Sequence, residues 1–307
     1  MAIKKVGLTS CSNGHHPEWE DQIDELVSVL AGMGIEAVRA EHIISKIDDF
    51  AGTDEERARD LMKFYEDDSI DAIFDISGGD LANGVLKYLD FDVIAKSKKL
   101  FWGYSDLTTI INAIYTRTGK ESVLYQVKNM VWSEAQIQQK RFTEYLRSDS
   151  ITTANGIVTS ANRSIATADG DSDNPYDCSL FNIDYDFLQG SSMEGIVVGG
   201  NIRCLTKLAG TQYWPDMTDK ILFLESLGGE CGQIATLFTQ LDNMGVFDKV
   251  AGVILGTFTN YEKADLELSV YDLLKMHISP ELPVAHTPDI GHGKNSKAIV
   301  IGKEMFL

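Results

Sequence analysis

The sequence predicts an α/β protein with an N-terminal doubly wound, mostly parallel sheet domain and a smaller C-terminal α/β domain with mixed strands. In the first half of the 307 residues, short apolar strands alternate with amphipathic helices, the pattern of a parallel sheet. From residue 148 to 194, Ser, Thr, Asn, Asp and Gly dominate and periodicity fades. Alternation resumes after Gly195. We therefore expect an N-terminal domain over residues 1–150, an interdomain connection over 151–190 and a C-terminal domain over 191–307.

Five strands separated by helices are expected in the N-terminal domain. The strands are apolar runs that end in turn-forming residues, over residues 4–10, 35–40, 71–77, 100–102 and 122–127. Between them, apolar residues recur at the spacing of one helix face, in segments 23–30, 58–65, 81–89 and 107–114. Thr53 with Glu56 three residues later is a capping box, so the second helix is expected to begin there.

The C-terminal domain is expected to contain both strands and helices. Its strands are apolar runs over residues 195–200, 220–226, 250–256, 282–286 and 298–303. One helix is expected from Asn201 and another over residues 234–241. Parallel sheets bind ligands at the carboxyl ends of their strands. In the N-terminal domain, that edge is where we expect three loops to meet, at residues 10–14, 78–80 and 103–106.

Composition and charge exclude several classes of function. The formal net charge is −19, which argues against nucleic acid or an anionic membrane as a partner. No apolar run reaches the length of about eighteen residues that spans a membrane, and the N-terminus lacks the apolar region of a signal peptide, so a cytoplasmic protein is expected. No metal is expected, because the four cysteines form no C-x-x-C pair and Cys11 near His15 and His16 lacks a regularly spaced third ligand.

Ser105 lies at a sharp corner between an apolar strand and a helix, in the segment FWGYSDLTT. A serine at such a turn can hold its hydroxyl clear of the sheet as a nucleophile, and the N-terminus of the next helix can stabilise an oxyanion. The usual pattern is G-x-S-x-G; here Gly103 is present, but Leu107 replaces the second glycine. Serine is also among the best helix N-caps, and this stretch taken alone favours the cap.

A serine nucleophile needs a base and a group that orients the base. Of the six histidines, His292 lies between two glycines in the turn DIGHGKNS, where an imidazole can project into a cleft or remain in solvent. His286 in VAHTP is its competitor. Glu225 ends the apolar strand ILFLES, where a carboxylate is placed either for a site or to reach solvent. The chain order Ser105, Glu225, His292 also occurs in α/β-hydrolases.

Three segments together resemble a known family. They are SGGDLANGVLKYLDFDVIAKSKKLFWGYSDLTTIINAIYTRTG, GIVVGGNIRCLTKLAGTQYWPDMTDKILFLES and GHGKNSKAIVIG. These segments resemble the LD-carboxypeptidases, a family of serine peptidases, and within that family the microcin C immunity (MccF-like) branch. The resemblance covers most of the chain. It implies an N-terminal domain that bears the serine, a smaller C-terminal domain that bears the Glu and His, a homodimer, and no metal or organic cofactor.

The resemblance also implies roles for particular residues. It implies that Ser105, Glu225 and His292 form the serine–glutamate–histidine triad of the family. It places the oxyanion hole at the backbone N–H groups of Gly79 and Asp106. These assignments imply a hydrolase that cleaves amide bonds through an acyl-enzyme.

Two substrate classes fit the resemblance. One is a peptidyl or aminoacyl nucleotide of the microcin C type, cleaved at the amide that joins the acyl group to the nucleotide part. The other is a murein tetrapeptide, which would lose its terminal D-alanine. Four residues are expected at the substrate. Two are Asn201 and Asp80, and at the position of Asp80 many relatives have an aromatic residue. The other two, Trp132 and Tyr213, are aromatic and either stack on adenine or pack in the core. A small-molecule-binding protein without catalysis is the alternative from another class.

Overall fold

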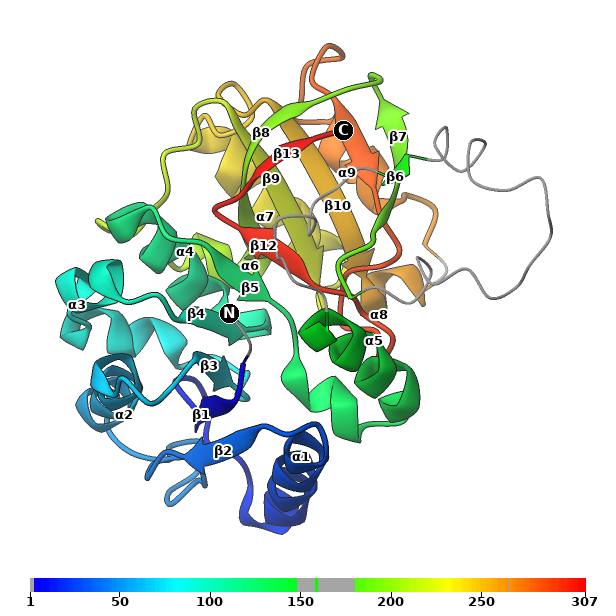
Figure 1. The fold of residues 1–307 in the computed structure, drawn as a ribbon. Coiled ribbons are helices and arrows are strands. Elements are labelled where there is room, and N and C mark those ends of the chain that lie inside the picture. Colours follow the sequence, from blue (N-terminus) through cyan, green and yellow to red (C-terminus); the bar gives the residue numbers. More distant parts are fainter. Residues whose placement is uncertain (1–2, 148–157, 160–179, 265) are drawn as a thin grey trace, which may run out of the picture.

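The computed structural model describes residues 3–147, 158–159, 180–264 and 266–307, and these residues build two sheets (Figure 1). The first sheet has six strands in the order β12-β5-β4-β3-β1-β2. The second has seven strands in the order β13-β8-β9-β10-β11-β7-β6. The predicted fold class is confirmed. Much of the expected connection over 151–190 lies outside the described residues.

The first sheet is parallel except at one edge. Its parallel strands occur in the predicted places, as β1 (Lys5–Thr9), β2 (Glu36–Arg39), β3 (Ala72–Asp75), β4 (Leu100–Gly103) and β5 (Ser122–Leu124). The edge strand β12 (Ile299–Ile301) pairs antiparallel with β5. This strand comes from the end of the chain, which we expected to stay within the C-terminal domain. The two halves of the chain therefore share one sheet.

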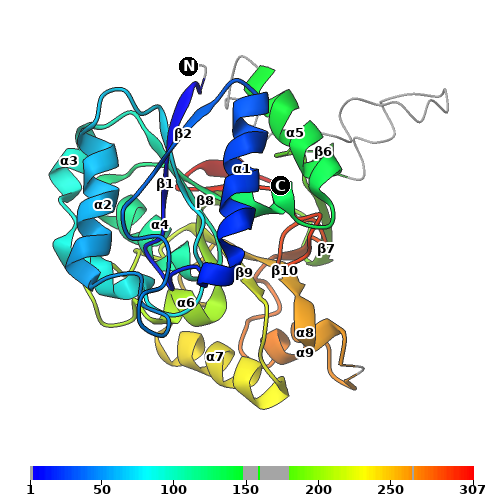
Figure 2. The same ribbon diagram turned by 90° about the horizontal axis from the view of Figure 1, so that it is seen from below.

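Helices cover both faces of the first sheet, as a doubly wound fold requires (Figure 2). One face carries α1 (Glu20–Gly32) and α5 (Ala135–Arg147); the other carries α2 (Asp54–Glu66), α3 (Phe91–Lys96) and α4 (Thr108–Thr118). The capping box of Thr53 and Glu56 is confirmed at the start of α2. The sequence did not predict α3 or α5, and the helix expected near residues 81–89 is a 3-10 helix over Ala82–Tyr88.

The second sheet has a parallel centre and antiparallel neighbours. The parallel strands are β8 (Glu194–Asn201), β9 (Lys220–Ser226), β10 (Gly252–Phe258) and β11 (Val284–His286). The other three strands are β6 (Val158–Thr159), β7 (Asp184–Gln189) and β13 (Glu304–Phe306). The helices of this half are α6 (Ile202–Thr206), α7 (Cys231–Asn243), α8 (Thr259–Glu262) and α9 (Val270–Lys275). The sequence did not predict β13, α8 or α9.

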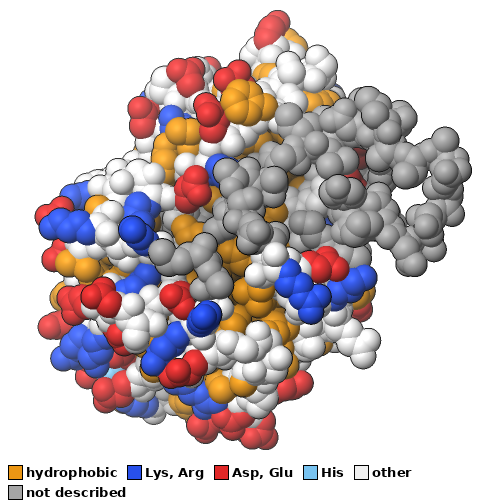
Figure 3. Space-filling view, viewed as in Figure 1, with side chains coloured by type: hydrophobic (Ala, Val, Ile, Leu, Met, Phe, Trp, Pro, Cys, Tyr) orange, Lys and Arg blue, Asp and Glu red, His pale blue; other side chains and the backbone are white. Residues whose placement is uncertain are grey.

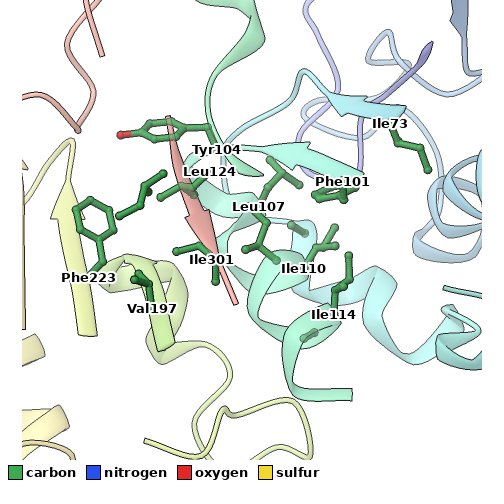
Figure 4. Close-up of a cluster of buried hydrophobic side chains, with 14 of the residues drawn as sticks. Ile73, Phe101, Tyr104, Leu107, Ile110, Ile114, Leu124, Val197, Phe223 and Ile301 are labelled. Atoms are coloured by element: carbon green, nitrogen blue, oxygen red, sulfur yellow. The ribbon is translucent and has the colours of Figure 1, made fainter. Parts of the chain in front are cut away.

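The strand β9 shows how the second sheet packs on both faces. Side chains alternate along a strand, so Leu222 and Leu224 pack with α7 and α9 in one apolar cluster. Ile221 and Phe223 point to the other face and join the cluster formed by α2 and α4. Figure 4 shows Phe223 at the edge of that cluster. One apolar core thus runs through both halves of the chain.

Hydrogen bonds also fasten the second sheet to helix α4. The Asn112 side chain accepts from Gly199 N and donates to Gly199 O, both at 2.9 Å. Asn201 N donates to Thr108 Oγ1 at 3.0 Å. A Cβ atom at Gly200 would lie 2.5 Å from Thr108 Oγ1, so only glycine lets strand and helix approach this closely. The start of α4, and with it Ser105, is therefore fixed relative to β8.

Charged side chains of both signs lie on the face of the molecule that is seen in Figure 3. Figure 3 shows acidic and basic side chains interspersed over the face viewed. None of the described helices is long and apolar enough to cross a membrane.

Candidate active site

Ser105 occupies a strained turn between β4 and α4. Its φ angle is 57°, in the left-handed region that is uncommon for a residue other than glycine. A short 3-10 turn over Ser105–Leu107 leads into α4, whose N-cap position is held by Leu107 without a side-chain hydrogen bond. The interpretation of Ser105 as a helix cap is therefore wrong. The backbone strain matches that of a nucleophile elbow, although Leu107 replaces the second glycine.

The structure brings Ser105, His292 and Glu225 together from distant parts of the chain. His292 Nε2 lies 3.1 Å from Ser105 Oγ, and His292 Nδ1 lies 2.7 Å from Glu225 Oε2. Glu225 is the penultimate residue of β9 and is fully buried, and the His292 side chain is 12% exposed. The competing histidine, His286, lies on β11 and lines a different cavity. The geometry of the three residues is that of a hydroxyl, a base and an orienting acid.

The buried Glu225 carboxylate has further hydrogen-bond donors. Tyr104 Oη donates to Oε2 at 3.0 Å, and Asn201 Nδ2 donates to Oε1 at 3.1 Å. Burial and the Glu225 charge raise the pKa of Tyr104, so its phenol stays protonated and can donate. The Tyr104 ring also packs edge-on against His292, with centroids 4.9 Å apart. Asn201 therefore positions Glu225 in addition to lining the cavity, and Tyr104, which was not singled out from the sequence, contacts both Glu225 and His292.

The loop that carries His292 is held by helix α5 of the first half. Gln138 is fully buried, and its Nε2 donates to Lys294 O and Ser296 O, both at 2.9 Å. Its Oε1 accepts from Tyr125 Oη at 3.0 Å. Arg141 adds a third bond, to Asn295 O at 2.7 Å. The position of His292 therefore depends on contacts that cross between the two halves.

Gly79 lies in a loop that packs against the elbow. Its φ angle is 123°, and a Cβ atom there would lie 2.3 Å from the side chain of Asn13. The same Asn13 side chain accepts from Asp80 N at 2.8 Å. Both the backbone conformation and the space therefore require glycine at this position. The next residue, Asp80, forms an exposed ion pair with Arg203.

Asp106 ties the Gly79 loop to the elbow through its side chain. The carboxylate is fully buried and accepts from Ser12 Oγ at 2.6 Å, Ala82 N at 2.8 Å and Lys207 Nζ at 2.5 Å. Its charge is thus paired and hydrogen-bonded, as a buried charge must be. Within the described residues, the backbone N–H groups of Gly79 and Asp106 have no hydrogen-bond acceptor. Two unpaired donors beside a serine can stabilise an oxyanion.

A cavity of about 620 Å³ opens at Ser105. It is lined by both halves of the chain, with Gly79 and Ser105 from the first and the remainder from the second: Asn201, Arg203, Ser226, Leu227, Gly228, Gly229, Gly232, Gln233, Thr236, Leu237 and Asn260. The size is ordinary for a site that binds a small molecule. The sequence pattern gave no indication of the wall formed by residues 226–237.

The two aromatic residues expected at the substrate do not border this cavity. Tyr213 lines a separate cavity of about 160 Å³, and its hydroxyl donates to Leu86 O at 3.2 Å. Trp132 is 37% exposed, with Lys128 Nζ above its ring. For Tyr213, the contact with Phe91, at 5.7 Å between ring centroids, supports the packing alternative.

One group of described residues has the ligand types of a metal site. It consists of Glu41, His42 and Asp60, whose ligand atoms lie within 4.8 Å of one another. His42 Nδ1 lies 2.8 Å from Asp60 Oδ2, which also accepts from the His42 backbone N–H. None of the three lines the cavity at Ser105. The group is therefore separate from the candidate active site.

Comparisons with known proteins agree with this architecture. The probable murein peptide carboxypeptidase of Bacillus subtilis is 26% identical over 309 aligned positions, covering 97% of this chain and 86% of the relative. The microcin C7 self-immunity protein MccF of Escherichia coli is 27% identical, covering 84% of this chain and 76% of the relative. A structure of MccF in complex with glutamyl sulfamoyl guanosine has a TM-score of 0.81 at 23% identity, covering 100% of this chain and 93% of that one.

Two family models match the chain in order along its length. Residues 6–125 match the LD-carboxypeptidase N-terminal domain, and residues 194–307 match the LD-carboxypeptidase C-terminal domain. The first match contains Ser105 and the second contains Glu225 and His292. The chain therefore belongs to the LD-carboxypeptidase family.

Proposed function

We propose that this carboxypeptidase is a serine amidase of the microcin C immunity type. It hydrolyses the amide that joins an aminoacyl or peptidyl group to a nucleotide-like leaving group. The observation that carries the proposal is the line of contacts from Ser105 Oγ to His292 Nε2, at 3.1 Å, and from His292 Nδ1 to Glu225, at 2.7 Å. Ser105 is the nucleophile, His292 the general base and Glu225 the group that orients His292.

The first half of the reaction forms an acyl-enzyme. Ser105 Oγ attacks the amide carbonyl carbon while His292 Nε2 takes the hydroxyl proton. The carbonyl oxygen becomes an oxyanion and is held by the N–H groups of Gly79 and Asp106, each worth about 3 kcal/mol of transition-state stabilisation. His292 then gives its proton to the amide nitrogen as the carbon–nitrogen bond breaks. The amine leaves and the acyl group stays on Ser105 as an ester.

The second half releases the acyl group. Water attacks the ester carbon, His292 takes a proton from the water, and the same N–H groups hold the second oxyanion. Collapse breaks the bond to Ser105 Oγ, which regains its proton from His292. Throughout, Glu225 keeps the Nδ1–H tautomer of His292 and stabilises the imidazolium. Tyr104 and Asn201, which donate to Glu225, hold its carboxylate in place.

The choice of substrate rests on the resemblance and on the cavity. MccF, which shares this fold, binds glutamyl sulfamoyl guanosine in its crystal structure. The cavity of about 620 Å³ is within the range that binds ligands of that size. Its wall offers hydroxyl and amide groups from Ser226, Gln233, Thr236 and Asn260, which suit a polar leaving group such as a nucleoside.

A murein tetrapeptide carboxypeptidase that releases D-alanine is the second candidate. The observation that favours it is the match to the probable murein peptide carboxypeptidase of Bacillus subtilis, which covers 97% of this chain. The same Ser105, Glu225 and His292 would perform that reaction, since both candidates cleave an amide. They differ in the acyl group and in the leaving group.

The test is incubation of the protein with two substrates in separate reactions, followed by mass analysis of the products. The substrates are an aminoacyl sulfamoyl adenosine and a murein tetrapeptide. We expect cleavage of the first at its amide, and no cleavage by the Ser105→Ala variant. Cleavage of the tetrapeptide alone would move the assignment to the second candidate. Cleavage of neither substrate would contradict the proposed function.

A further inference from the structure

The cavity at Ser105 contains one charged side chain among its described lining residues, that of Arg203. The chain as a whole has a formal net charge of −19, so a negatively charged substrate meets repulsion over most of the molecule. A single guanidinium in an otherwise uncharged wall is therefore the local feature that can bind an anion. Arg203 lies near the start of the short helix α6 and its side chain is 51% exposed, so its charge can be reached by a ligand.

Arg203 lies directly beside the proposed oxyanion hole. Its Nη2 donates to Gly79 O at 3.2 Å, and Gly79 is the residue whose N–H group faces the reacting oxygen in the proposed mechanism. The guanidinium is thus hydrogen-bonded to the same residue whose N–H group would hold the reacting oxygen. A group held by Arg203 would belong to the part of the substrate that is closest to the scissile amide.

The ion pair between Arg203 and Asp80 is exchangeable. Asp80 is 60% exposed and Arg203 is 51% exposed. Exposed ion pairs stabilise a protein little, because water screens them, so a carboxylate from a ligand can replace that of Asp80 at small cost. Lys207, the neighbouring cation, donates to the buried Asp106 at 2.5 Å and to Asp80 O at 3.0 Å, lies 3.6 Å from Asp80 Oδ1, and is absent from the described cavity wall. Arg203 is the cation available for exchange.

We infer that Arg203 is the specificity residue that binds the negative group of the leaving group, with Asp80 as its partner in the free enzyme. This inference rests on the proposed function. In both candidate substrates an anion lies within two bonds of the scissile nitrogen: the terminal carboxylate of a D-alanine, or the phosphoryl group of a nucleotide. A guanidinium binds either of them through two parallel hydrogen bonds, which a lysine cannot do.

The test compares ligands that differ in this negative group alone. One pair is a tetrapeptide ending in D-alanine and the same peptide ending in D-alanine amide. The other is an aminoacyl phosphoramidate of adenosine and the neutral amide of 5′-amino-5′-deoxyadenosine with the same aminoacyl group. Affinities are measured by calorimetry in the Ser105→Ala background, so that no ligand is consumed. The pair that shows a preference identifies the source of the anion.

We expect the anionic member of one pair to bind roughly 10- to 100-fold more tightly than its neutral partner, the range of a charge-assisted hydrogen-bonded contact. Arg203→Gln should reduce that preference to less than about threefold by weakening only the anionic member. Arg39→Gln is the matched control, because it also removes one arginine from an ion pair with an aspartate, outside the cavity. Equal weakening of both members, or no preference in either pair, would overturn the inference.

Asp80→Asn provides a test in the opposite direction. Removing the internal competitor should strengthen binding of the anionic member by roughly two- to fivefold, in keeping with the small energy of an exposed pair. Weaker binding of that member would contradict the role given to Asp80.

Failure of the proposed function would be seen in a different experiment, because the wild-type protein would then turn over neither candidate substrate. Labelling of Ser105 by a fluorophosphonate should persist in Arg203→Gln, and its loss would show that Arg203 acts on the elbow instead of the ligand.

Discussion

The Ser105 elbow and the His292 loop reach the same site by different means. Ser105 is held by regular structure, because β4 ends two residues before it at Gly103 and Ser105 itself begins the 3-10 turn that leads into α4. His292 lies between two glycines in a loop without regular structure, and its position depends on side-chain hydrogen bonds. Glu225 resembles Ser105 in this respect, since it is the penultimate residue of a buried strand.

This difference indicates where the site is vulnerable. The elbow is supported by the buried Asp106 network and by the fastening of α4 to β8. The loop of His292 is supported by Gln138 and Arg141, which come from a helix of the other half. Loss of one hydrogen bond should therefore affect the position of His292 more than that of Ser105. Five single substitutions, grouped into four experiments, test this comparison.

The largest effect is expected from removing the base or its orienting acid. His292→Ala should lower kcat on the order of 10⁶-fold, and Glu225→Gln on the order of 10⁴-fold, as in other serine hydrolase triads. The double variant should be no worse than His292→Ala, because the residues act as a unit. Steady-state kinetics with the substrate that is cleaved measures this. A decrease of less than tenfold in His292→Ala would remove it from the mechanism.

Gln138→Leu should have the next largest effect and tests the loop directly. The change leaves Lys294 O, Ser296 O and Tyr125 Oη without their partner. Each unsatisfied buried group costs about 1 kcal/mol or more, so we expect the free energy of unfolding to fall by about 3 kcal/mol. The kcat should fall at least tenfold as His292 loses its position. Gln136→Leu on the exposed face of α5 is the control. Unchanged kcat in Gln138→Leu would contradict the role of α5.

Gly200→Ala tests the support of the elbow. The new Cβ would lie 2.5 Å from Thr108 Oγ1, so β8 and α4 must separate. We expect the free energy of unfolding to fall by about 2 kcal/mol through overpacking. Gly245→Ala is the control, since Gly245 also has a positive φ but has no atom within 4 Å of the added Cβ. Denaturant titration compares the two; equal destabilisation would mean that backbone strain, not close packing, accounts for Gly200.

Tyr104→Phe should have the smallest effect. It removes one donor from Glu225 and leaves the ring against His292. A decrease in kcat of about tenfold is expected from the loss of one hydrogen bond to a charge. Burial raises the pKa of Tyr104 above its ordinary value of about 10, so the hydroxyl is protonated throughout the working range. The alkaline limb of the pH–rate profile should therefore be the same in both proteins, and a shifted limb would contradict this.

The fold could be predicted from the sequence because apolar periodicity marks most of its strands and helices. Helix α5 was missed for a physical reason: its fully buried positions include Gln138, a polar residue that interrupts the apolar face. The short strand β12 was found, but its sheet could not be predicted. An apolar run has the same pattern whether it pairs with β5 or with the second sheet.

The candidate site could be predicted in part. Glu225 and Ser105 lie near the ends of apolar strands, and His292 lies between two glycines. These positions in the sequence, together with the family resemblance, indicated all three residues. The supporting residues carry no local signal. Tyr104 bonds to a residue 121 positions away, and Gln138 bonds to one 156 positions away, so only the folded chain reveals them. The role of Arg203 could not be predicted either, because the cavity that it lines forms only where the two halves of the chain meet.

The most direct test of the account is the labelling of Ser105 by a fluorophosphonate, located by peptide mass analysis. Such a probe reacts with a serine that a neighbouring base activates. We predict one adduct on Ser105 in the wild-type protein, much slower labelling in Glu225→Gln, and almost none in His292→Ala. Labelling of Ser105 at the same rate in all three proteins, or an adduct on another serine, would contradict the claim that His292 and Glu225 activate Ser105.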